Sequence, residues 1–143
     1  MSPLRRRAAL IAGAGVAIGI AVLVYRGPGW RFTRGHVGDV GAAMVVYAAL
    51  LAAFPRWRTR AHVFACLGIT TAVELGQLVW YSVGRTTAGA LVLGSVFDPI
   101  DLAAYAAGTA LAAFAATRGG QNSSNENRGA MSRRGRPNAR GGA

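Results

Sequence analysis

The chain has 143 residues, 52% of them hydrophobic, and a mean hydropathy of +0.32, which is more apolar material than a soluble domain of this size buries. The net charge of +11 comes from 16 Lys+Arg against 5 Asp+Glu, but the arginines flank long apolar runs, which excludes nucleic acid from the expected partners. The single cysteine, Cys66, excludes an internal disulfide and a cysteine-based metal or redox site.

The first apolar run extends from Ala8 to Tyr25 and follows three consecutive arginines. Its length reaches the roughly 17 to 25 residues that span the hydrocarbon of a bilayer. A cleaved signal peptide is the competing interpretation, but the run is long and ends without a small-residue cleavage site, so we predict a retained helix. Gly15 and Gly19 form a GxxxG pair that permits close helix approach.

Two further runs have the length of membrane helices. The second, Val37 to Phe54, is interrupted by Asp39 and followed by an interfacial segment with three arginines and a tryptophan. The third, Val63 to Val83, carries polar residues in its interior and ends beside interfacial aromatics. Both are predicted to cross the membrane.

A shorter apolar stretch, Ala88 to Phe97, precedes the last predicted crossing and is too short for a full span, so it is expected to be re-entrant or interfacial. The fourth crossing is expected to begin near Asp98, as the N-cap before Pro99, and to end at Thr117. We therefore predict an all-α membrane protein, a bundle of four transmembrane helices with a short re-entrant or interfacial segment before the last helix.

The composition divides the chain into three parts. Residues 1–7 form a basic N-terminus, residues 8–118 the transmembrane helical domain, and residues 119–143 a tail rich in Arg, Gly and Asn that is predicted to be disordered. Arginines are concentrated at the N-terminus, in the loop after the second helix and in the tail. The positive-inside rule therefore places both termini in the cytoplasm.

Acidic residues inside apolar helices are costly, about 2.5 kcal/mol or more each, and so require an explanation. With this topology they gather in the extracytoplasmic half, where we predict a polar ligand-binding pocket. Its expected members are Asp39, Glu74, Gln77, Arg85, Asp98, Asp101 and Tyr105. We predict that Glu74 and Arg85 interact, as a purely structural ion pair or as part of a functional site. Asp98 can also be only a helix cap, and His36 is predicted to be an interfacial loop residue.

Spacing assigns faces to the last two helices. Cys66, Thr70 and Glu74, with Gln77 and Tyr81, recur every three or four residues and are predicted to face into the bundle. On the fourth helix, a small-residue seam for close packing is expected, formed by Ala104, Gly108 and Ala112.

A family resemblance rests on scattered residues in order between Val37 and Ala116. They are Gly38-Asp39, Glu74-x-x-Gln77, Arg85-Thr86-Thr87, Gly94, Phe97, Asp98-x-x-Asp101, Tyr105 and Gly108. This order resembles an uncharacterised bacterial family of small membrane proteins and, more distantly, the VanZ-like family. VanZ-like members usually have Asn where Tyr105 stands, and an expected large aromatic after Asp39 is absent. The resemblance implies a four-to-five-helix membrane protein, with some VanZ-like relatives linked to glycopeptide-antibiotic resistance.

Three functions are compatible with this pattern. The favoured one is a non-catalytic protein of the bacterial cell envelope that binds the head group of a lipid or a lipid-linked cell-wall precursor. The others are a membrane-embedded enzyme using Glu74 or Asp101 as acid or base, with a divalent metal between carboxylates as a further option, and a proton- or ion-coupled transporter, which would have to be a homo-oligomer. No nucleophile–base pair or metal-ligand motif is visible, so no cofactor and no metal are expected. Membrane lipids are the expected partners.

Overall fold

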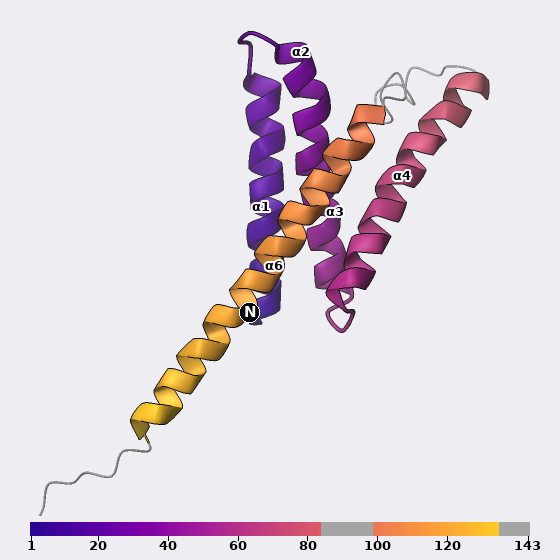
Figure 1. The fold of residues 1–143 in the computed structure, drawn as a ribbon. Coiled ribbons are helices and arrows are strands. Elements are labelled where there is room, and N and C mark those ends of the chain that lie inside the picture. The colour runs from indigo at the N-terminus through magenta and orange to yellow at the C-terminus, as the bar shows by residue number, and fades with distance from the viewer. Residues whose placement is uncertain (84–98, 135–143) are drawn as a thin grey trace, which may run out of the picture.

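The structure, a computed structural model, describes residues 1–83 and 99–134, and of residues 31, 77–83, 99 and 119–134 it describes the backbone alone. The elements, in chain order, are α1 (Pro3–Val24), α2 (Trp30–Phe32), the π-helix η1 (Thr33–Val37), α3 (Gly38–Ala53), α4 (Thr59–Val83) and α6 (Pro99–Arg134). Successive long helices run in alternating directions (Figure 1). The predicted all-α fold with four long helices is confirmed.

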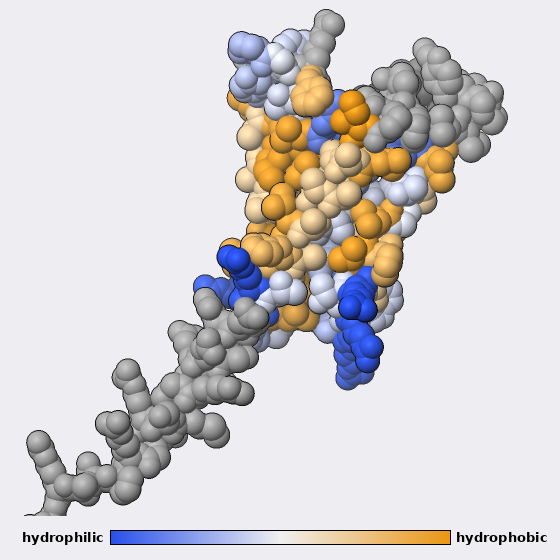
Figure 2. Space-filling view, viewed as in Figure 1, coloured by the Kyte–Doolittle hydropathy of each residue, from blue (hydrophilic) through white to orange (hydrophobic). Residues whose placement is uncertain are grey.

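Three segments are long and apolar enough to cross a membrane: Pro3–Val24, Thr33–Ala53 and Ile100–Arg118. Large apolar side chains cover the outside of the bundle, among them Leu10, which is 65% exposed, and Phe64, which is 73% exposed (Figure 2). In water this surface would cost free energy, whereas lipid solvates it. The chain is therefore a membrane protein. The remaining long helix, α4, has 25 residues, which is enough by length for a span.

The first helix begins earlier than its apolar run. The side chain of Ser2 accepts a hydrogen bond from the Arg5 backbone N–H at 3.4 Å, and Pro3 occupies the first turn, where its missing N–H has no cost. The helix therefore includes the arginines that the sequence pattern left outside it.

The second predicted span also begins earlier, because helical turns continue back from Gly38 to Trp30. Five of these residues, Thr33–Val37, form a turn of π-helix, which is wider than an α-helical turn. The turn before them depends on Gly29, whose φ of 72° lies in the left-handed region that glycine adopts without strain. This segment positions the first residue of the site described below.

Small residues set the distance between helices. A Cβ added to Gly15 of α1 would lie 2.6 Å from the Gly41 carbonyl oxygen of α3, and one added to Gly108 of α6 would lie 2.4 Å from the Val40 carbonyl oxygen. The predicted seam on the fourth helix is confirmed, since Ala104 and Ala112 beside Gly108 are buried. A Cβ added to Gly19, the other member of the GxxxG pair, would meet no atom of another helix within 4 Å among the described residues.

The two ends of the bundle differ in charge. The start of α1, the α3–α4 loop and α6 near Arg118 lie at the same end (Figure 1). Hydrophilic surface from arginines gathers there (Figure 2), and those exposed are Arg5, Arg6, Arg56, Arg58, Arg60 and Arg118. One end is thus strongly basic.

Two further predictions concern the short apolar stretch before the last helix and the chain beyond Arg118. The stretch Ala88 to Phe97 lies outside the described residues. Beyond Arg118, α6 continues as a helix to Arg134, where composition predicted a disordered tail, and Figure 1 shows this part extending away from the bundle. A prediction from composition alone does not consider the helix that precedes the tail. Residues can be added to the end of an existing helix without a new nucleation step.

Candidate functional site

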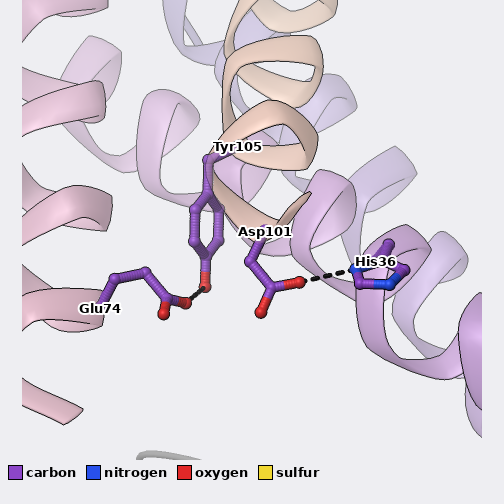
Figure 3. A network of polar contacts seen from close by, with 4 residues as sticks. All are labelled: His36, Glu74, Asp101 and Tyr105. Atoms are coloured by element: carbon purple, nitrogen blue, oxygen red, sulfur yellow. Dashed lines mark hydrogen bonds and ion pairs between the residues drawn. The ribbon is translucent and has the colours of Figure 1, made fainter. Parts of the chain in front are cut away.

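Polar side chains from three parts of the chain meet at the end of the bundle opposite the basic end. Figure 3 shows Glu74 from α4, Asp101 and Tyr105 from α6, and His36 from η1. Asp39, in the first turn of α3, belongs to the same group. We call these five residues the polar cluster. Its members come from positions up to 69 residues apart, so only the fold assembles them.

The first contact in the polar cluster joins η1 to α6. Nδ1 of His36 lies 2.7 Å from Oδ1 of Asp101, and each side chain is 16% exposed. The ring of Phe32 packs edge-on against the imidazole, with 4.3 Å between ring centroids. A short contact of this kind is a charge-assisted hydrogen bond when the imidazole is protonated. It fixes the orientation of the imidazole in either protonation state.

The second contact joins α6 to α4. The Tyr105 hydroxyl donates a hydrogen bond to Oε1 of Glu74 at 3.1 Å, and the two residues are 7% and 1% exposed. Burial of a carboxylate is costly unless hydrogen bonds or charges compensate it, and this hydroxyl supplies one such bond. Tyr105 also interacts electrostatically with Asp39.

Asp39, His36 and Asp101 form a group of closely spaced side chains that could hold a metal ion. One ligand-type atom from each, a carboxylate oxygen or an imidazole nitrogen, lies within 4.8 Å of the other two. All three side chains are partly buried. Two carboxylates and one imidazole therefore converge on a small volume.

Of the seven predicted pocket residues, the structure brings together Asp39, Glu74, Asp101 and Tyr105. Arg85 and Asp98 lie outside the described residues, as does the side chain of Gln77, so the predicted Glu74–Arg85 interaction stays a prediction. The acceptor role of Glu74 toward Tyr105 was not anticipated.

The prediction for His36 is wrong, because it lies in a helical turn and contacts Asp101 rather than standing in an interfacial loop. The spacing between His36 and Asp39 in the sequence indicated that they lie together. His36 precedes Asp39 by three residues, which places both on one face of a continuous helix. The assumption that the helix begins at Val37 concealed this relation.

The predicted inward face of α4 is confirmed for its described part, since Cys66, Thr70 and Glu74 are at most 5% exposed. Sγ of Cys66 lies 3.3 Å from the Thr109 hydroxyl and 3.4 Å from the Ala43 carbonyl oxygen. Cys66 is therefore a buried packing residue that joins three helices. The side chains of Gln77 and Tyr81 lie outside the description.

A second buried histidine, His62, lies near the basic end and was not singled out from the sequence. It is 1% exposed, and its Nε2 is 3.2 Å from the Phe54 carbonyl oxygen at the end of α3. Its ring lies 5.8 Å from the Tyr47 and Trp57 ring centroids. These contacts indicate a structural role, closing the α3–α4 loop.

A surface groove between α1 and α3 is separate from the polar cluster. It has a volume of about 470 Å³ and is lined by alanines and Val45, with Arg5 contributing to its lining. An apolar groove facing outward suits acyl chains of the bilayer rather than a polar ligand.

Fold and site together define an all-helical membrane protein with a carboxylate-rich polar cluster at one end of its bundle. The chain belongs to the family described as Protein of unknown function (DUF2809), whose model matches residues 29–109, more than half of the chain. The matched range contains all five members of the polar cluster, whereas α1 lies before it. No curated protein and no solved structure matches the chain.

Proposed function

We propose that this chain is a multi-pass protein of the bacterial cell membrane whose polar cluster binds the head group of a lipid or a lipid-linked cell-envelope precursor. The observation that carries the proposal is the convergence of Asp39, Glu74 and Asp101, with His36 and Tyr105, at one end of an apolar bundle. One ion pair is enough to fix helix register, so three carboxylates suggest a ligand.

The chemistry of the cluster favours a ligand rich in hydrogen-bond donors. Carboxylates only accept hydrogen bonds when ionised, and they pair with ammonium groups and hydroxyls. Lipid and precursor head groups present such groups at the depth where a helix begins. The Gln77, Arg85 and Asp98 side chains are proposed to complete the pocket, with Arg85 toward a phosphate.

The charge distribution supports an orientation. The basic end of the bundle is expected to face the cytoplasm by the positive-inside rule, which puts the polar cluster in the extracytoplasmic half of the membrane and both termini inside. In this arrangement α4 is the third crossing and α6 the fourth. The distant resemblance to the VanZ-like family is consistent with a role in the cell envelope.

The second candidate function is a membrane-embedded enzyme acting on a lipid-linked substrate. The His36–Asp101 contact favours it, because a carboxylate that orients an imidazole is a frequent arrangement for a general base. Chemical turnover of a co-purified lipid would select this candidate over binding alone.

Native mass spectrometry of the protein extracted with its lipids tests the proposal. We expect a lipid adduct on the wild type that is reduced at least about tenfold in Asp101→Asn, equivalent to about 1.4 kcal/mol of lost binding free energy. Tyr25→Phe is the control, because Tyr25 is 41% exposed and its hydroxyl donates to the Pro28 carbonyl oxygen of the neighbouring turn. Equal adducts in wild type and Asp101→Asn would contradict head-group binding.

A further inference from the structure

We propose that His36, Asp39 and Asp101 bind one divalent transition-metal ion, and we take zinc as the representative ion. The inference deepens the proposed function, since the ion would lie in the same polar cluster and offer a coordination position to a head-group oxygen. The geometric basis is the convergence of one ligand atom from each residue within 4.8 Å.

The distances are close to those of a coordination shell. Ligand atoms about 2 Å from a common zinc ion lie roughly 3.3 Å from one another in tetrahedral geometry. His36 Nδ1 and Asp101 Oδ1 are 2.7 Å apart, so they need to separate slightly to take an ion in place of the proton between them. Asp39 needs to approach by at most about 1.5 Å, which a carboxylate rotation at the start of α3 can provide.

The donor set selects the class of metal. Imidazole nitrogen suits zinc and other first-row transition ions, whereas magnesium and calcium prefer a shell of oxygens. Three protein ligands with an open position are the pattern of zinc sites that bind an exchangeable ligand, in contrast to closed structural sites with four. A head-group phosphate or hydroxyl oxygen fits that open position.

Charge supports the same assignment. As ligands, two ionised aspartates and a neutral imidazole would carry two negative charges, which a divalent ion neutralises at a depth where net charge is costly. The three ligands also come from η1, the start of α3 and α6, so the ion would join the η1–α3 segment to α6. The sequence shows no metal motif because Asp101 lies 65 residues after His36.

The test is zinc titration of the full-length, detergent-purified protein without a histidine tag, followed by calorimetry and metal analysis. We expect one zinc ion per chain, not displaced by a tenfold excess of Mg²⁺. Asp39→Asn and Asp101→Asn should each weaken zinc binding by more than the roughly 10- to 100-fold typical of losing an outer-shell partner. Glu126→Gln is the matched control, as it removes a carboxylate from the part of α6 beyond Arg118, outside the polar cluster, and should leave binding within about threefold.

Two measurements keep the test decisive if an aspartate variant does not fold, as judged by circular dichroism and gel filtration. His36→Gln removes the nitrogen ligand from the partly exposed π turn and should show the same loss. X-ray absorption of the zinc-bound wild type should show nitrogen and oxygen neighbours at about 2.0 to 2.2 Å and no sulfur at about 2.3 Å. Absence of saturable zinc binding, equal binding by the ligand variants, or a sulfur neighbour would overturn the proposal.

The outcomes separate this inference from the proposed function. Zinc binding lost in the ligand variants, with lipid adducts equal in wild type and Asp101→Asn, would support the metal site and reject head-group binding. Lipid adducts that depend on Asp101 in a protein that binds no zinc would reject the metal site alone.

Discussion

Single residues in the polar cluster connect whole helices, and Tyr105 is the clearest example. It lies on α6, donates to Glu74 of α4 and interacts with Asp39 of α3. The sequence placed Asp39 and Glu74 in one pocket through the cost of buried charge, and Tyr105 through its helical spacing from Asp101. It did not identify the individual contacts, because these depend on how far each helix is rotated about its axis. His36 was missed because the helix was expected to begin at Val37, one residue after it.

Removal of the Tyr105 hydroxyl tests this contact. Tyr105→Phe should lower the free energy of unfolding by about 0.6 to 1.7 kcal/mol, from the average to the largest value measured for interhelical hydrogen bonds in a membrane protein. Thermal unfolding in detergent should then shift by a few degrees, about 2 to 4 °C per kcal/mol. Tyr25→Phe, which removes an exposed hydroxyl, should shift it by less than 1 °C, about 0.3 kcal/mol. Additive effects of Tyr105→Phe and Glu74→Gln in a double-mutant cycle would show that the two side chains are not coupled.

Helices and their contacts follow from apolar length and small residues, and most of this was predictable. The four long helices were expected from hydropathy, and the Ala104, Gly108 and Ala112 seam from spacing. The π turn Thr33–Val37 was not, because its residues have no pattern that separates it from a loop. The GxxxG pair shows the same limit, since sequence spacing does not tell which glycine meets a neighbouring backbone.

Alanine substitutions at the two glycines of that pair should differ. Gly15→Ala places a methyl group 2.6 Å from the Gly41 carbonyl oxygen, so α1 and α3 must separate, at a cost of about 1 to 3 kcal/mol. Gly19→Ala meets no described atom within 4 Å and should be neutral or stabilising by up to about 1 kcal/mol, since alanine restricts the unfolded chain. Thermal unfolding of the two variants checks the difference, and equal midpoints would contradict the described packing of α1 on α3.

Six exposed arginines lie at one end of the molecule, and the carboxylates of the polar cluster lie at the other end, where Arg26 and Arg34 are also exposed. Reporter fusions after Arg60 and Arg118 should therefore both report the cytoplasm, and a fusion after Gly29 the outside, because arginine-rich segments are retained inside. An external signal after Arg118 would instead require five crossings, with Ala88 to Phe97 joined to a true span.

The same polarity predicts which parts of the chain its activity requires. The polar cluster contains the residues that are costly in a membrane, whereas the part of α6 beyond Arg118 extends away from the bundle. In a deletion strain with an envelope phenotype, Glu74→Ala and Asp101→Ala should fail to complement, while a chain truncated after Arg118 should complement fully. Gly68→Ala, at an exposed position of α4 with no described atom within 4 Å of the added methyl, is the control for expression. If both acid variants reach the membrane at wild-type abundance and restore growth, the carboxylates serve only to hold the helices together, and head-group binding is rejected.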